Sequence, residues 1–162
     1  MADVRFDGTA GGDSDPVAHR IVPAQPPDVG KDRMTWPVVY YRQSDGAEPA
    51  DQFIRAQPAA AQAAIDNYLE RLALFGPQLG YPSTSQIEGE LRELRPDLGN
   101  VHYRLLYRRT GNIFVILHAF TKSGARIDRA EIDVAIERWK DLKARMNAVP
   151  RRQPRALGHE AL

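Results

Sequence analysis

Hydrophobic positions recur at helical spacing in two segments, and this pattern predicts helices over residues 58–75 and 128–146. The first stripe comprises Ile65, Tyr68, Leu69, Leu72 and Phe75, and the second comprises Ile132, Ala135, Ile136, Trp139, Leu142 and Met146. Asp128 is suited to cap the second helix, with Glu131 as its capping-box partner. A shorter helix is predicted from Pro49, and it should form a hairpin with the helix at 58–75 against one face of a sheet.

Strand patterns lie on either side of this helical hairpin. Residues 36–41 are β-branched and aromatic, and three further strand-like runs lie within residues 90–122. Residues 110–112 form a tight turn between the last two runs, whereas residues 79–89 have the composition of a loop. The order strand, helix, helix, three antiparallel strands, helix predicts an α+β fold. In it, an N-terminal strand and the helix hairpin pack on an antiparallel-rich sheet, and a C-terminal helix follows.

Alternation along the strands predicts which side chains share a face of the sheet. In the middle run one face carries Tyr103, Leu105 and Tyr107, and the other carries His102, Arg104, Leu106 and Arg108. In the first run the two faces carry Arg92 with Leu94 and Glu93 with Arg95. The third run is apolar at nearly every position except His118, which is typical of a strand covered on both faces. We therefore expect one packed face and one partly cationic face.

The composition narrows the kinds of site that the chain can carry. Its 162 residues and 43% hydrophobic content fit one domain. The formal net charge is +1, so any affinity for nucleic acid must come from local clusters of cations. The chain has no cysteine, which excludes disulfides and thiolate catalysis. Its four histidines are scattered, so neither a metal ion nor a cofactor is expected.

The two ends of the chain differ in composition from its middle. Residues 1–33 are rich in Gly, Pro and Asp and are predicted to be a disordered N-terminal extension. The folded domain is expected over 34–147, with a flexible basic tail over 148–162. Because Met34 directly precedes the first strand, a start at Met34 rather than Met1 is an alternative. No segment has the pattern of a membrane-spanning helix or a signal peptide, so a cytoplasmic location without a membrane partner is expected.

Five short motifs occur in the order in which one toxin superfamily carries them. They are Phe75-Gly76-Pro77 with Leu79-Gly80, Glu93-Leu94-Arg95, Tyr103-Arg104 with Tyr107, Leu117-His118-Ala119-Phe120 with Lys122, and Glu131-Ile132 with Ala135. Over roughly residues 36–146 the chain therefore resembles the RelE/ParE toxin superfamily, and most closely its HigB-like, phage-derived branch.

This resemblance implies the toxin of a type II toxin-antitoxin system, held in a heteromeric complex by a cognate helix-turn-helix antitoxin. Toxins of this branch usually act as ribosome-dependent endoribonucleases that cut mRNA and so inhibit translation. They work without metal, because the 2′-hydroxyl of the RNA attacks the adjacent phosphate. The protein supplies cations and proton-transfer groups, and positioned guanidinium groups stabilise the charge that gathers on the phosphate oxygens.

The resemblance also implies roles for individual residues. Arg95 and Arg104 match arginines that bind or orient the scissile phosphate, and Lys122 matches a phosphate ligand or proton-transfer group. Glu93 is expected to act as a base or to hold these arginines, and His118 is a candidate general acid or base with a structural role as its alternative. The predicted surface residues or general RNA contacts are Arg92, Arg108, Arg109 and Arg126. The alternative for the arginines is a solvated sheet edge, ion-paired to Glu90, Glu93 and Asp97.

Two other functions stay open at this point. Ser123 stands where relatives often carry a second lysine, and Leu142 is nearest to a tyrosine that several relatives carry. These departures favour a catalytically degenerate toxin-like binding module. The other alternative is a toxin that poisons DNA gyrase, as in the ParE branch.

Overall fold

A computed structural model describes residues 35–148 of the chain. Its elements are, in order, β1 (Val38–Tyr40), α1 (Pro49–Arg55), α2 (Ala59–Phe75), the 3-10 helix η1 (Gly76–Gln78), β2 (Thr84–Glu88), β3 (Leu91–Leu94), β4 (Asp97–Leu98), β5 (Val101–Thr110), β6 (Ile113–Lys122) and α3 (Arg129–Ala148). The three predicted helices are therefore confirmed. The predicted extension over 1–33, the alternative start at Met34 and the predicted tail beyond residue 148 lie outside the described residues.

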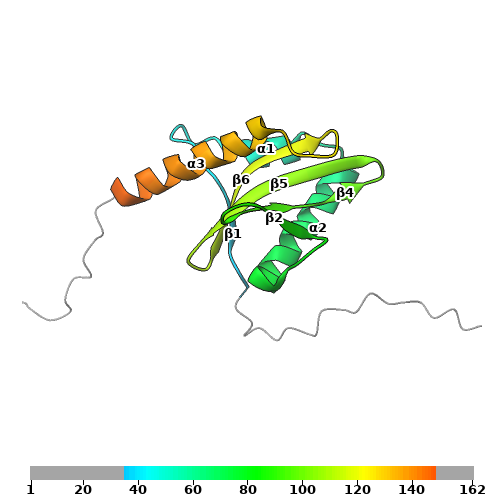
Figure 1. The fold of residues 1–162 in the computed structure, drawn as a ribbon, viewed down its shortest axis with the longest axis horizontal. Helices are drawn as coiled ribbons and strands as arrows, with labels where there is room; N and C mark the ends of the chain where they lie inside the picture. The colour runs from blue at the N-terminus through cyan, green and yellow to red at the C-terminus, as the bar shows by residue number, and fades with distance from the viewer. Residues whose placement is uncertain (1–34, 149–162) are drawn as a thin grey trace, which may run out of the picture. The chain divides into compact units, whose positions relative to one another are not determined.

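The strands form one mixed sheet in the order β1-β6-β5-β3-β2, with β4 paired to β5 (Figure 1). β1 runs parallel to β6, and every other pairing is antiparallel. The predicted α+β fold with an antiparallel-rich sheet is confirmed. The tight turn between β5 and β6 is also confirmed, and Gly111 adopts a φ of 58° there, which glycine tolerates without steric cost.

The hairpin of α1 and α2 packs on one face of the sheet, as predicted. Ile54 of α1 and Ile65 and Leu72 of α2 are fully buried in the same core as Leu105 and Ile116 of the central strands. Removal of these side chains from water holds the hairpin on the sheet, because apolar burial is the dominant favourable term in folding.

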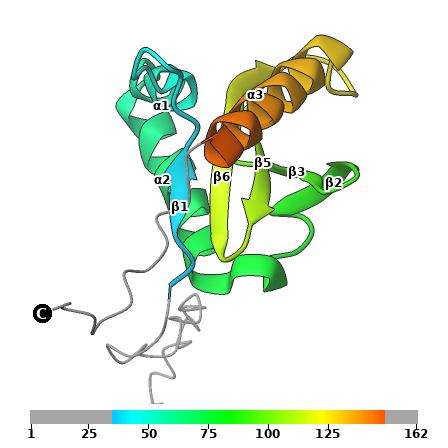
Figure 2. The same ribbon diagram turned by 90° about the vertical axis from the view of Figure 1, so that its left-hand side faces the viewer.

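The opposite face of the sheet is packed as well, because α3 lies on it, so the expectation that only one face is packed is wrong (Figure 2). Ala135 of α3 is fully buried in a second core that also contains Leu106 and Val115. Alternation alone placed apolar and charged side chains on this face but gave no measure of how much of it a helix would cover. Arg95, Arg104 and Lys122 also lie on this face, which is therefore both packed and partly cationic.

A bulge in β6 turns two successive side chains toward α3. Leu106 pairs with His118 and Tyr107 pairs with Ile116, so Leu117 is the additional residue in β6. Leu117 belongs to the core under α3, and His118 contacts the side chains of α3 directly. Strict alternation would have placed one of these two side chains on the other face.

The prediction of a loop over residues 79–89 is wrong in its second half. Residues Thr84–Glu88 form the edge strand β2, in which Ser85 pairs with Glu93 of β3. The sequence of this strand is short and largely polar, so only its pairing with β3 identifies it. The short strand β4 is likewise defined only by its pairing, in which Asp97 lies opposite His102 of β5.

The predicted capping box at the start of α3 is also wrong. The backbone oxygen of Asp128 accepts hydrogen bonds from the backbone N–H groups of Glu131 and Ile132. The carboxylate of Glu131 does not return to Asp128 but contacts the ring of His118. Within residues 35–148, no helix is long and apolar enough to cross a membrane.

Candidate functional site

Glu93 of β3 lies between two arginines on the α3 side of the sheet. Its Oε1 accepts a hydrogen bond of 2.6 Å from the Oγ of Ser85 in β2. The Nε of Arg95 lies 3.4 Å from Oε1, and the Nε of Arg104 in β5 lies 3.7 Å from Oε2. All three charged side chains share one face because Glu93 pairs with Leu106, two residues from Arg104. The predicted phosphate ligands are thus brought together around the predicted base.

Arg104 is buried, with a side chain only 3% exposed. Its Nη1 donates to the Oδ1 of Asp97 at 2.9 Å and to the backbone oxygen of Tyr103 at 2.7 Å. The same Asp97 oxygen lies 2.9 Å from the Nδ1 of His102. Burial raises the pKa of Asp97, but the hydrogen bonds from Arg104 and His102 outweigh it and hold that pKa below its usual range. Asp97 is therefore an ionised anchor that fixes the guanidinium of Arg104.

Three buried polar atoms of this cluster have no hydrogen-bond partner among the described residues. They are Oε2 of Glu93, Nε of Arg95 and Nε of Arg104. Native proteins leave few buried polar groups without partners, and a catalytic role is one of the established reasons for such groups. Guanidinium N–H groups are well suited to the oxygens of a phosphate.

Tyr81 was not among the predicted site residues, yet it stands next to this cluster. The guanidinium carbon of Arg95 lies 5.3 Å from the centre of the Tyr81 ring, and Tyr81 is 80% exposed. The backbone N–H of Arg95 also donates to the oxygen of Ser83, which ties this loop to β3. The sequence signal that would have identified Tyr81 is an aromatic residue within a loop-like segment rich in Gly and Pro.

His118 is held between two side chains of α3. Nη1 of Arg138 lies 3.2 Å from Nδ1 of His118 and donates to the backbone oxygen of Leu117 at 2.9 Å. A guanidinium can only donate, so Nδ1 accepts and the proton of the neutral ring is on Nε2, which contacts Glu131. Burial lowers the pKa of His118, and Glu131 opposes this shift without reversing it. Both ring nitrogens are thus engaged, and the ring stacks on Phe120 at 5.2 Å.

Lys122 is the last residue of β6 and lies opposite His102 of β5. Phe120 pairs with Arg104 in the same register, so Lys122 shares the face of Arg104 and lies two residues farther along. Its side chain is half-buried, and within residues 35–148 it makes no ion pair. The described structure therefore places Lys122 on the same face as Arg104, one cross-strand pair beyond it.

The comparison with protein families identifies the group to which this chain belongs. A family model described as Phage derived protein Gp49-like (DUF891) matches residues 52–140. The chain belongs to this Gp49-like family. It is also 33% identical over 93 residues to proteins named Probable endoribonuclease HigB1 from two strains of Mycobacterium tuberculosis, CDC 1551 / Oshkosh and ATCC 25618 / H37Rv. Each match covers 57% of this chain and 73% of the relative, so the predicted resemblance to HigB-like toxins is confirmed.

The Gp49-like match contains all of the predicted site residues, but the structure does not gather them on one surface. The five predicted catalytic residues, Glu93, Arg95, Arg104, His118 and Lys122, lie on the α3 side of the sheet. The predicted RNA contacts Arg92 and Arg109 lie on the opposite side, where they line a pocket next to η1. Closeness in the sequence therefore does not show which arginines lie on the same face of the sheet.

The other two predicted RNA contacts have separate surroundings in this Gp49-like fold. Arg108 donates to Glu90 at 2.6 Å, and its guanidinium carbon lies 4.6 Å from the centre of a Trp139 ring. Arg126 is exposed in the loop after β6 and borders the same small hollow as Lys122. The alternative interpretation, in which the arginines are ion-paired to nearby acids, agrees with these contacts. Arg108 pairs with Glu90, Arg95 with Glu93 and Arg104 with Asp97.

Proposed function

We propose that this Gp49-like protein is the toxin of a type II toxin-antitoxin system and cleaves mRNA on the ribosome without a metal ion. The observation that carries the proposal is the group of buried, unpartnered atoms on Glu93, Arg95 and Arg104. Two guanidinium donors beside a carboxylate acceptor match the needs of a phosphodiester that is attacked by its neighbouring hydroxyl. The name of the Mycobacterium tuberculosis relatives, Probable endoribonuclease HigB1, supports RNA as the substrate.

In the proposed reaction Arg95 and Arg104 bind the non-bridging oxygens of the scissile phosphate. Glu93 accepts the proton of the 2′-hydroxyl, whose oxygen then forms a bond to phosphorus. The bond between phosphorus and the 5′-oxygen breaks, and Lys122 donates a proton to that leaving oxygen. The products are a 2′,3′-cyclic phosphate and a 5′-hydroxyl end. The two guanidinium groups stabilise the negative charge that develops on the phosphate in the transition state.

His118 takes a positioning role in this proposal rather than a proton-transfer role. Both of its ring nitrogens face groups of α3, Glu131 and Arg138, and burial lowers its pKa. A ring held in this way fixes the distance between β6 and α3 behind Lys122. The proton transfers are therefore assigned to Glu93 and Lys122.

The proposed partners follow from the family of the chain and its toxin relatives. The toxin acts in the cytoplasm on ribosome-bound mRNA, and a cognate helix-turn-helix antitoxin neutralises it in a heteromeric complex. The antitoxin gene is expected next to the toxin gene.

A second candidate is a toxin-like module that binds RNA or antitoxin but does not cleave. The burial of Arg104 and its bond to Asp97 favour this candidate, because a guanidinium that is 3% exposed has limited access to a phosphate. Arg95, which is 24% exposed, would then make the main contact to RNA.

The test is induction of the full chain in cells, followed by primer extension on cellular mRNA. New 5′-hydroxyl ends that arise within translated reading frames support the proposal. A reconstituted translation mixture then compares cleavage with and without ribosomes. Arrest of growth without RNA cleavage, together with loss of DNA supercoiling by gyrase, would replace the proposal by gyrase poisoning.

A further inference from the structure

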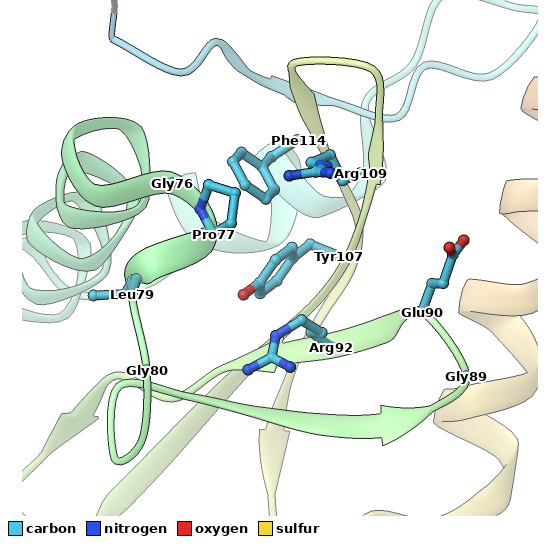
Figure 3. Close-up of a pocket in the computed structure, with 10 residues that line it drawn as sticks. All are labelled: Gly76, Pro77, Leu79, Gly80, Gly89, Glu90, Arg92, Tyr107, Arg109 and Phe114. Atoms are coloured by element: carbon cyan, nitrogen blue, oxygen red, sulfur yellow. The ribbon is translucent and has the colours of Figure 1, made fainter.

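A pocket of about 420 Å³ opens on the face of the sheet opposite the Glu93 cluster. It lies between η1 and the ends of β3 and β5, and its lining includes Pro77, Glu90, Arg92, Tyr107, Arg109 and Phe114 (Figure 3). Its volume is within the range of about 300 to 1,000 Å³ that small-molecule sites occupy. The pocket is therefore large enough for one nucleotide-sized ligand.

The polar groups of the pocket are mainly hydrogen-bond donors. Figure 3 shows Tyr107 between Arg92 and Arg109, with Pro77 of η1 beside the Tyr107 ring. Arg92 is oriented by a hydrogen bond of 3.0 Å from its Nη2 to the Oγ1 of Thr84, whose hydroxyl donates in turn to the backbone oxygen of Leu79. Burial raises the pKa of Tyr107, so its hydroxyl remains a neutral donor.

The one carboxylate of the lining does not cancel this positive charge within the pocket. Glu90 is engaged by Arg108 at 2.6 Å and stands apart from the two arginines at the turn between β2 and β3 (Figure 3). With Arg92 and Arg109 facing the pocket, the local charge favours an anion. Arginine is the side chain best matched to the paired oxygens of a phosphate.

The aromatic rings of Tyr107 and Phe114 form the wall next to these donors, and Trp36 lies against Phe114 outside the lining. The ring centres of Trp36 and Phe114 are 5.7 Å apart, and those of Tyr107 and Phe114 are also 5.7 Å apart. The guanidinium carbon of Arg109 lies 5.6 Å from the centre of a Trp36 ring. Aromatic and guanidinium surfaces of this kind bind the flat face of a nucleobase.

We propose that this pocket is a nucleotide-binding site, separate from the cleavage site, in which Arg92 and Arg109 hold a phosphate and Pro77 and Phe114 contact the base. The ligand is either a free nucleotide or one nucleotide of an RNA strand. The site is on the other face of the sheet from Glu93, so it does not rest on the proposed cleavage activity.

The two tryptophans of the chain provide a probe on each face of the sheet. Trp36 lies beside the pocket, whereas Trp139 belongs to α3 and lies against Arg108 on the other face. The full chain is titrated by NMR with each of the four nucleoside 5′-monophosphates, and the two indole N–H signals are followed. A saturable shift of the Trp36 signal, with the Trp139 signal unchanged, is the expected result. Short single-stranded RNA as a separate titrant then distinguishes an RNA nucleotide from a free one by its tighter binding.

Matched arginine variants complete the experiment. Arg109 is exposed, so Arg109→Gln should fold normally and bind at least about tenfold more weakly, as expected for the loss of a charge-assisted hydrogen bond. Arg42→Gln removes the same charge from an exposed ion pair with Glu48 and should bind like the unchanged protein. The absence of a saturable Trp36 shift would overturn the proposal. So would equal affinity for inorganic phosphate and for the nucleotides, because the aromatic wall would then contribute nothing.

Failure of this site and failure of the proposed cleavage are distinguishable. Arg95→Gln should slow cleavage about 100- to 1,000-fold and leave the Trp36 shift intact, because Arg95 lies on the α3 side of the sheet. Loss of the Trp36 shift in Arg95→Gln would overturn the separation of the two sites.

Discussion

The Nε of Arg104 lies 3.7 Å from Oε2 of Glu93, and neither atom has a hydrogen-bond partner among the residues that the structure describes. The two groups attract one another as charges but leave their hydrogen-bonding capacity unused. A buried arginine and carboxylate usually complete such bonds, since unsatisfied buried groups cost about 1 to 3 kcal/mol each. Because both atoms are buried, bulk water does not take up this unused capacity.

The two arginines of the cluster should respond differently to substitution. Arg95→Gln is expected to slow RNA cleavage about 100- to 1,000-fold with little loss of stability, because the partly exposed guanidinium acts mainly on the transition state. Arg104→Gln is expected to lose activity and also about 1 to 3 kcal/mol of stability, because Glu93 and Asp97 would each lose a charged partner. Cleavage rates and urea denaturation measure the two effects, with Arg42→Gln as the charge-matched control. Full activity of Arg95→Gln would remove this residue from the site.

Glu93→Gln tests whether this carboxylate accepts a proton or only holds the arginines. The amide can still accept the hydrogen bond from Ser85 but is a very weak base. We expect the cleavage rate to fall about 100- to 10,000-fold and the acid side of the pH–rate profile to flatten. Glu90→Gln is the matched control, since it removes a carboxylate that pairs with Arg108 at a site 76% exposed. An unchanged profile shape with a lower stability would assign Glu93 to the support of Arg95 and Arg104.

Tyr81 should contribute to RNA binding rather than to chemistry. Its ring is 80% exposed and lies against Arg95, so one nucleobase next to the scissile phosphate can stack on its open face. Tyr81→Ala should weaken binding about 5- to 100-fold, in line with the stacking energy of about 1 to 3 kcal/mol per base. Tyr81→Phe keeps the ring and should bind normally. Both variants should unfold at the same urea concentration as the unchanged protein, and equal binding by both would contradict stacking.

The sequence predicted the helices and strands that have a long, periodic pattern. It did not predict the features that depend on the strand with which a segment pairs. The stripe of α2 and the alternation along β5 each span many residues, so one sequence segment carries the whole signal. Strand β2 has five residues and lies at the sheet edge, and only its register with β3 defines it. The bulge at Leu117 depends on the register between β5 and β6, which no local pattern records.

The arrangement of the candidate site residues on the sheet could be predicted only in part. Alternation correctly placed Glu93 and Arg95 on one face, but the approach of Arg104 depends on the register of β3 and β5. The contact of His118 with Glu131 joins residues on two elements, and the sequence pattern assigned Glu131 to a helix cap instead. Long-range contacts of this kind determine how far a side chain is buried and therefore its pKa. The lowered pKa of His118 could not be predicted from the sequence for this reason.

His118 should make the folded state less stable in acid. Burial lowers its pKa below the usual value of 6.5, while Glu131 opposes and Arg138 adds to this effect. Below about pH 6.5 the unfolded chain therefore binds a proton that the folded chain does not, so stability falls as the pH drops toward the folded-state pKa. His118→Gln should show a shallower loss between about pH 7 and pH 5 in urea denaturation, and Arg42→Gln should keep the full slope. An NMR titration with a His118 pKa above 6.5 would contradict this prediction.

Gly76 should be far less tolerant of alanine than another glycine of similar backbone conformation. Gly76 has a φ of 53°, and a Cβ there would lie 2.4 Å from Nε1 of Trp36. Gly99 has a φ of 58°, and a Cβ there would have no neighbour within 4 Å. Gly99→Ala should cost about 1 to 2 kcal/mol from the backbone alone, whereas Gly76→Ala should cost about 1 to 3 kcal/mol more because the indole must move. Urea denaturation measures the difference, and the Trp36 indole signal should shift only in Gly76→Ala. Equal losses in the two variants would show that the backbone conformation, and not the contact with Trp36, requires glycine at position 76.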